Sequence, residues 1–114
     1  IAHFSREDDH VRMGSNGFIE GPVHIATPGR YRIGLWARGS SAKGTYPIVV
    51  VTLDGKELGR VECIGAEWGE HAIVADLAEG DAVLRLAFIN DYYEPPEDRN
   101  LWLDRVEFQL VDKP

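Results

Sequence analysis

Four carboxylates lie within eight consecutive positions of one polar segment of this 114-residue chain. The segment, residues 90–100, reads NDYYEPPEDRN, and its acids are Asp91, Glu94, Glu97 and Asp98. Carboxylates this close repel one another unless a cation compensates their charge, and hard oxygen ligands favour Ca²⁺ over transition metals. The spacing is not that of an EF-hand loop. The pattern therefore indicates either a calcium site or a solvated acidic loop whose two prolines discourage edge pairing.

Other residue types that carry chemistry show no functional spacing. The four histidines lack metal-binding spacing, and no serine stands in a nucleophile elbow. Cys63 is the only cysteine, so no disulfide forms within the domain, and its strand-like flanks predict an inert buried thiol. Because one loop on a domain this small supplies no deep cleft between two acids, the sequence argues against a glycosidase, and against an enzyme in general.

Strands separated by turns account for most of the sequence. Alternating apolar residues and β-branched runs predict strands near 18–20, 23–26, 31–37, 48–53, 56–63, 71–76, 83–89 and 101–110. Turns recur roughly every eight to twelve residues, which is typical of an all-β domain, here an antiparallel β-sandwich of jelly-roll type.

Three local signals refine this fold. Asp54-Gly55 predicts a hairpin turn, because both of its residues need φ > 0. A bulge near Asp104-Arg105 would reconcile the two apolar parities of the last strand. The polar segments 38–46 and 90–100 are expected to be long irregular loops, which is where function usually lies.

The charge and length of the chain limit its partners and organisation. The net charge is −7, from 19 acidic and 12 basic residues, so nucleic acids and anionic membranes are not expected as partners. Residues 1–114 suffice for one hydrophobic core, hence one domain. The chain begins at Ile1 without a signal-peptide pattern. We expect a domain cut from a longer protein, covalently linked to neighbouring domains, and secreted, periplasmic or on the cell surface.

The string FINDYYEPPEDRNLWLDRVEF resembles the Asn-Asp…Asp-Arg-Asn-Leu segment of calcium-dependent xylan-binding carbohydrate-binding modules. Three upstream segments agree with this: GRYRIGLWA at 29–37, Gly-x-x-Pro at 44–47 and VTLDG at 51–55. The resemblance spans roughly residues 10–110, as expected for one domain. It implies a jelly-roll module that holds Ca²⁺ at its rim and binds vicinal sugar hydroxyls through open positions on the ion.

Carried over by motif position, the resemblance implies metal ligands in the acidic segment. Asp91 and Asp98 match the acids of the motif, and a carbonyl from Glu97 or Arg99 would complete the shell. Asn90, Asn100 and Asp104 are expected to brace the loop through hydrogen bonds to its backbone. Residues predicted to contact or border the sugar are Tyr46, Tyr92, Tyr93, Asn100 and Trp102.

Aromatic rings complete this kind of recognition, because they stack on sugar C–H faces. Tyr92 and Tyr93 are the best candidates, since adjacent residues in an extended loop cannot both point inward. Most aromatics in a small sandwich are core, and parity assigns Tyr31, Phe88 and Phe108 to it. Trp36 lies opposite its strand's apolar set, so it is either a surface platform or covered by another element.

The sequence thus predicts a non-catalytic, calcium-dependent module that binds a xylan-like polysaccharide. One alternative is a structural or interaction sandwich of a larger secreted protein with at most a structural Ca²⁺. Another is a small hydrolase.

Overall fold

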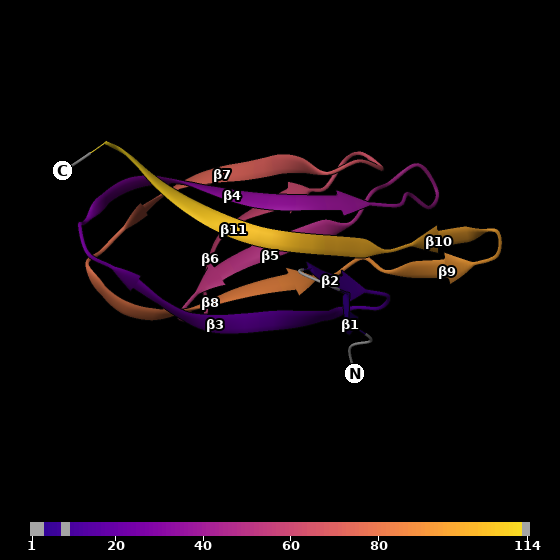
Figure 1. The fold of residues 1–114 in the computed structure, drawn as a ribbon, viewed down its shortest axis with the longest axis horizontal. Helices are drawn as coiled ribbons and strands as arrows, with labels where there is room; N and C mark the ends of the chain where they lie inside the picture. The colour runs from indigo at the N-terminus through magenta and orange to yellow at the C-terminus, as the bar shows by residue number, and fades with distance from the viewer. Residues whose placement is uncertain (1–3, 8–9, 113–114) are drawn as a thin grey trace.

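β-strands make up all the regular structure in the part of the chain that the computed structural model describes, residues 4–7 and 10–112 (Figure 1). A five-stranded sheet has the order β1-β2-β11-β4-β7, a four-stranded sheet has the order β3-β8-β5-β6, and β9 and β10 form a small sheet of their own. All pairings are antiparallel, which confirms the predicted all-β sandwich. The strands are β1 Phe4–Glu7, β2 His10–Met13, β3 Gly17–Ile25, β4 Gly29–Gly39, β5 Ile48–Leu53, β6 Lys56–Glu62, β7 Gly69–Leu77, β8 Gly80–Phe88, β9 Tyr92–Glu94, β10 Glu97–Arg99 and β11 Leu101–Asp112.

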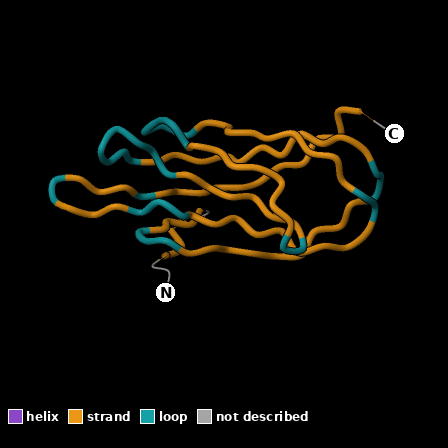
Figure 2. Tube along the Cα trace, turned by 180° about the vertical axis from the view of Figure 1, so that it is seen from behind, coloured by secondary structure: helices purple, strands orange, loops and turns teal. Residues whose placement is uncertain are grey.

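The hydrophobic core lies between the two large sheets, which Figure 2 shows from behind. Successive strand residues point to opposite faces, so the alternation in β4 buries Tyr31, Ile33, Leu35 and Ala37, as predicted. The four-stranded sheet contributes Val49, Val51, Leu84, Leu86 and Phe88 from the other side. Each fully buried side chain of leucine size contributes about 1.5–3 kcal/mol, so this core holds the two sheets together.

Two local predictions in the turns are confirmed. Asp54 and Gly55 have φ of 49° and 82° and link β5 to β6. The register of β11 against β4 shifts between Leu103 and Arg105, at the predicted bulge. Leu101 and Leu103, which precede the bulge, and Val106 and Phe108, which follow it, therefore all face the core. One extra residue reverses which face of a strand the later side chains point to.

The N-terminal third of the fold differs from the prediction. β3 runs unbroken from Gly17 to Ile25 through Gly21-Pro22, where the sequence predicted a break between two short strands. β3 is an edge strand that pairs only with β8, and Pro22 is compatible with an edge because the missing N–H is not needed on the open side. The sequence analysis also missed β1 and β2.

Residues 38–46 are not the long irregular loop that was predicted. β4 continues to Gly39, and Ala42 and Thr45 then form a bridge in which each N–H donates to the other's carbonyl oxygen, both at 3.0 Å. Lys43 and Gly44 complete this turn with φ of 53° and 76°. The segment is therefore a compact loop with backbone pairing of its own.

Cys63 lies in the core and is fully buried. Burial raises the pKa of its thiol to about 12, and the nearby charge of Glu62 adds to the rise. A protonated thiol is neither a nucleophile nor a metal ligand, which confirms the prediction of an inert cysteine.

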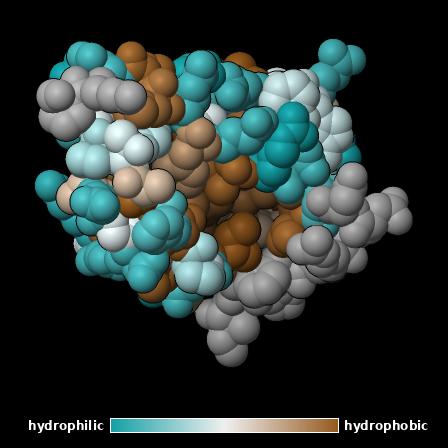
Figure 3. All heavy atoms as spheres, turned by 60° about the vertical axis from the view of Figure 1, so that its left-hand side comes forward, coloured by the Kyte–Doolittle hydropathy of each residue, from teal (hydrophilic) through white to brown (hydrophobic). Residues whose placement is uncertain are grey.

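The described part of the chain has an apolar hollow on its surface and lacks a helix that could span a membrane. An apolar hollow of about 220 Å³ opens at the sandwich edge and is lined by residues of β3, β8 and β11. Apolar side chains gather in a hollow on this side of the molecule (Figure 3). Within residues 4–7 and 10–112, no helix is long and apolar enough to cross a membrane.

Candidate calcium site

The acidic segment 90–100 forms a hairpin rather than an irregular loop. Tyr92–Glu94 (β9) pairs with Glu97–Arg99 (β10), and Pro95-Pro96 makes the turn. Proline suits the turn because its missing N–H is not required by the ladder there. The hairpin projects beyond the two large sheets at one end of the sandwich (Figure 1). The expectation of a loop was wrong, but the segment does lie at the rim.

Asp91 and Asp98 are brought together by this hairpin. Arg99 pairs with Tyr92 and Asp98 with Tyr93, so Asp91, just before β9, lies diagonally across from Asp98. Diagonal neighbours in an antiparallel pair share a face. Burial is the main cause of the raised pKa of Asp91, and the charge of Asp98 adds to the rise.

One oxygen of Asp91 lacks the partner that a buried carboxylate needs. Its Oδ1 is buried and accepts no hydrogen bond in the described part of the chain. Burial raises the pKa of Asp91; a backbone hydrogen bond at Tyr92 and the charge of Arg99 oppose the rise, and the charge of Asp98 adds to it. A buried, unpartnered carboxylate oxygen beside a second carboxylate is costly without a cation. These residues therefore fit a hard cation such as Ca²⁺.

Protein side chains alone do not complete such a shell. No group of three or more His, Cys, Asp or Glu side chains among the described residues is arranged to hold a metal ion. Two carboxylates would need backbone carbonyls, water or ligand hydroxyls beside them, and Ca²⁺ accepts all of these.

Asp91→Asn tests the cost of this uncompensated charge. The pKa of Asp91 is higher in the folded protein than its ordinary value, so the ionised form destabilises the metal-free fold at neutral pH. We expect the variant to melt at a higher temperature than the parent in chelator at pH 7, and to lose the stabilisation by Ca²⁺. The gain should shrink as pH falls through the raised pKa, since the parent then becomes neutral too.

Thermal unfolding with chelator and with calcium, at pH 7 and near pH 4, measures both effects. A variant that melts below the parent without metal, or that calcium still stabilises, would contradict the assignment of Asp91.

The Arg99 side chain is buried and hydrogen-bonded to backbone carbonyls. It is 7% exposed, and its guanidinium donates to the backbone carbonyls of Ala42, Thr45 and Asn90, with Nε 2.8 Å from the oxygen of Thr45. Arg99 thereby ties the 40–47 loop to the start of the hairpin. From the sequence, only the backbone carbonyl of Arg99 was predicted to take part, as a ligand of the metal. The structural role of its side chain was not predicted.

The predicted ligand Glu97 lies at the same end of the sandwich. Its carboxylate oxygen Oε2 accepts a 3.3 Å hydrogen bond from the backbone N–H of Lys43. The side chain of Glu97 thus joins the hairpin to the neighbouring loop.

Two asparagines and a serine brace the hairpin. Asn90 accepts from Ile48 N–H at 2.7 Å and donates to the Tyr46 carbonyl at 3.1 Å, as predicted for a bracing residue. The Ser40 hydroxyl donates to the Asp98 carbonyl at 2.8 Å and accepts from Asn100 N–H at 2.9 Å. The prediction that Asp104 braces the loop was wrong, because its carboxylate pairs with Arg105 at 2.6 Å.

Asn16 completes this support and was not identified from the sequence. Its side-chain oxygen accepts from Asp91 N–H at 2.6 Å. Asn16 lies in the Ser15-Asn16-Gly17 turn before β3, and no local signal marks it as a neighbour of a residue 75 positions away.

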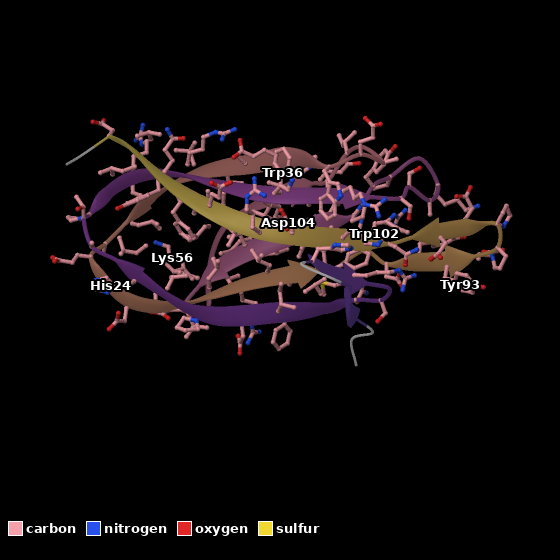
Figure 4. All side chains as sticks on the ribbon, in the orientation of Figure 1. His24, Trp36, Lys56, Tyr93, Trp102 and Asp104 are labelled. Carbon is pink, nitrogen blue, oxygen red and sulfur yellow. The ribbon has the colours of Figure 1, made fainter. Side chains whose placement is uncertain are left out.

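The five residues predicted to contact or border the ligand are not equally accessible. Tyr93 is 69% exposed and pairs with Asp98 in the hairpin. Figure 4 shows Tyr93 at the projecting end of the sandwich. Tyr92 is half-buried, with its ring 5.8 Å from both Lys43 Nζ and Arg99 Cζ, and its hydroxyl donates to Glu94 at 2.7 Å. Tyr93 is therefore the ring best placed for stacking.

The other three, Asn100, Tyr46 and Trp102, lie outside the two strands of the hairpin. Asn100 is 7% exposed and is held by Ser40 through its backbone, which fits a bracing role. Tyr46 is half-buried in the neighbouring loop. Trp102 is half-buried between the core residues Leu101 and Leu103, so it points to the outer face of the five-stranded sheet.

The fold is similar to those of solved carbohydrate-binding modules. One is a CBM36 module in complex with calcium and xylotriose (TM-score 0.70, 21% identity, 87% of this chain and 79% of that chain). Another is the CBM36-1 domain of a multidomain xylanase from the hindgut metagenome of Trinervitermes trinervoides (0.79, 13%, 96% and 86%). A third is a family 35 module from Clostridium thermocellum (0.69, 18%, 96% and 88%). The fold class is therefore that of a carbohydrate-binding module.

The family follows from the sequence. Residues 32–112 match the family CBM60, described as Ca-dependent carbohydrate-binding module xylan-binding, and the chain belongs to that family. No match was found among curated protein sequences. The resemblance noted in the acidic segment is thereby confirmed, and with it the prediction of a calcium-dependent, xylan-binding type of module.

Proposed function

We propose that Asp91 and Asp98 hold a Ca²⁺ ion at the base of the β9–β10 hairpin, and that this ion binds adjacent hydroxyls of a xylan-like chain. The buried, unpartnered Oδ1 of Asp91 beside a second carboxylate carries this proposal. The calcium dependence of the family supports it. A carbonyl from Glu97 or Arg99 would complete the shell, as the motif implies.

The recognition chemistry follows from the ion and the exposed ring. Two hydroxyls replace two waters of similar donor strength on the ion, so the net gain is modest. Tyr93, opposite Asp98 and largely exposed, would add about 0.5–1.5 kcal/mol by stacking on the sugar. We expect affinities for short oligosaccharides in the millimolar to micromolar range, about −4 to −8 kcal/mol.

The module is proposed to be non-catalytic and to serve a larger secreted protein. Its acids cluster on one hairpin that projects from the end of the sandwich, whereas glycoside hydrolysis needs two carboxyl groups on either side of the scissile bond. One of the similar structures is itself a domain of a multidomain xylanase, which supports covalently linked neighbouring domains for this chain.

Titration calorimetry with xylo-oligosaccharides, with and without chelator, tests this function. We expect binding in calcium, none in chelator, and none for analogues that have one of the paired hydroxyls methylated. Calcium alone should raise the melting temperature, because a ligand at a hundred times its Kd stabilises the native state by about 2.7 kcal/mol.

The alternatives give different results. An interaction domain with a structural Ca²⁺ would melt higher in calcium but bind no glycan, and a hydrolase would release shorter sugars from the polymer. Binding that survives the chelator would contradict the proposed role of the ion.

A further inference from the structure

All three tryptophans of the chain lie on one surface, the outer face of the five-stranded sheet, which we term the tryptophan face (Trp36, Trp68 and Trp102). Trp36 in β4 and Trp102 in β11 alternate with buried core residues and therefore point outward. Trp68, just before β7, contacts the same Arg38 as Trp102 does. Figure 4 shows Asp104 and Trp102 along β11, with Trp102 nearer the hairpin, and Trp36 of β4 beside Asp104.

This face contains a hollow of a size suited to a sugar unit. It has a volume of about 320 Å³ and is lined by His10, Trp36, Trp68 and Asp104. Ligand sites typically start at about 300 Å³ and combine aromatic walls with a few polar groups. The His10 and Trp68 rings meet edge to face at 5.2 Å. None of these four residues belongs to the calcium site, so the hollow is a separate feature.

Guanidinium groups lie against the tryptophan rings. The Cζ of Arg38 is 4.4 Å from the centroid of Trp102 and 5.4 Å from that of Trp68. The Cζ of Arg12 is 5.9 Å from the centroid of Trp102, and the Cζ of Arg105 is 5.0 Å from that of Trp36. Such cation–π contacts hold the planar guanidinium in place while its N–H groups remain donors.

Arg12 and Arg38 have no acidic partner among the side chains that the structure describes. The carboxylates Asp104 and Glu70 of this face pair with Arg105 and Arg32. Among the described side chains, those of residues 10–112, no ion pair is formed by Arg12 or by Arg38, and Nε of Arg38 is buried without a hydrogen-bond partner. Arg12 and Arg38 thus place guanidinium groups without a described acidic partner beside aromatic rings, which is complementary to an anion that carries a stacking surface.

We propose that the tryptophan face binds an acidic polysaccharide through its uronate units, independently of calcium. The pyranose rings would stack on the tryptophans, and Arg12 and Arg38 would donate to the carboxylate, since guanidinium matches carboxylate geometry. This proposal rests on the proposed function only in that the ligand is a carbohydrate, as the family description indicates. It does not depend on the calcium site. The module would then have two faces of different specificity, one for neutral hydroxyl pairs and one for acidic chains.

Tryptophan fluorescence tests this proposal directly, because every tryptophan lies on the proposed face and none is in the hairpin. The full chain is titrated with oligogalacturonate in chelator, which also prevents calcium from cross-linking the ligand. We expect a saturable change in emission that weakens with salt. The same oligomer after reduction of its carboxyl groups should bind at least about tenfold more weakly.

Matched variants locate the site. Arg12→Gln should weaken the acidic oligomer at least about tenfold, and Arg38→Gln should do the same if it folds, as judged by its melting temperature. Arg60→Gln is the control for charge, since Arg60 lies on β6 of the other sheet and pairs with Glu57 at 3.0 Å; it should have no effect. Asp98→Ala should also leave this binding intact, so that failure of the calcium site is distinguishable.

Three results would overturn the proposal. One is the absence of any emission change when oligogalacturonate is added. Another is a response that is equal for the neutral oligomer or unchanged in Arg12→Gln. The third is tighter binding of a single-stranded oligonucleotide, because aromatic stacking with basic groups also suits nucleic acids.

Discussion

Replacing Arg99 with methionine is expected to destabilise the fold by about 3 kcal/mol or more. The guanidinium is 7% exposed and donates to three backbone carbonyls, those of Ala42, Thr45 and Asn90. Methionine fills similar space but leaves these oxygens without donors, and each hydrogen bond to a charged group contributes about 1.5–3 kcal/mol. Because the carbonyls belong to the loop and the hairpin base, calcium-dependent binding should be lost as well.

Urea unfolding measures the loss of stability, and two further variants interpret it. Arg99→Lys should recover only part of it, since a single ammonium does not reproduce the planar fork of the guanidinium. Arg30→Met is the control, because Arg30 pairs with Asp76 at 3.3 Å on the exposed surface and such pairs contribute about 0–1 kcal/mol. If Arg99→Met were as stable as Arg30→Met, the buried guanidinium would not hold the loops together.

The sequence was most informative where one local pattern determines the structure. Alternation identified the buried face of β4, because period-two burial follows directly from strand geometry. The Asp54-Gly55 turn and the bulge before Arg105 were likewise local signals. Pro22 misled the prediction, because proline is excluded only from central strands, and whether a strand lies at an edge depends on the whole sheet order.

The acidic residues of the site could be found from composition, but their support could not. Asp91 and Asp98 stand out as clustered charges in one short segment. Ser40 and Asn16 reach this hairpin across 58 and 75 positions of sequence, and only the paired sheets bring them there. The same holds for Arg99, whose place in the motif says nothing about the three carbonyls that its side chain contacts.

The prediction of long irregular loops at residues 38–46 and 90–100 was wrong for a related reason. Residues 90–100 contain few apolar residues, so no alternation marks β9 and β10. The hairpin is stabilised by backbone pairing and by the contacts of Asn90 and Arg99 at its base, none of which depends on a hydrophobic face. A hairpin at the rim with polar side chains suits a metal site, because it positions carboxylates outside the hydrophobic core.

Asp98→Ala is expected to reduce calcium-dependent binding of xylo-oligosaccharides at least about 100-fold, or about 2.7 kcal/mol, while the sandwich stays folded. Asp98 lies in β10 at the rim, and its backbone carbonyl, which the substitution keeps, accepts the hydrogen bond from Ser40. Only the carboxylate beside Asp91 is removed. Calorimetry measures binding, and thermal unfolding with calcium and chelator measures the metal. Glu94→Ala is the matched control, because it removes one charge from the same hairpin at an exposed position. Parent-like binding by Asp98→Ala would show that Asp98 does not hold the ion. Equal losses in both variants would show that the overall negative charge of the hairpin matters and not a specific carboxylate ligand.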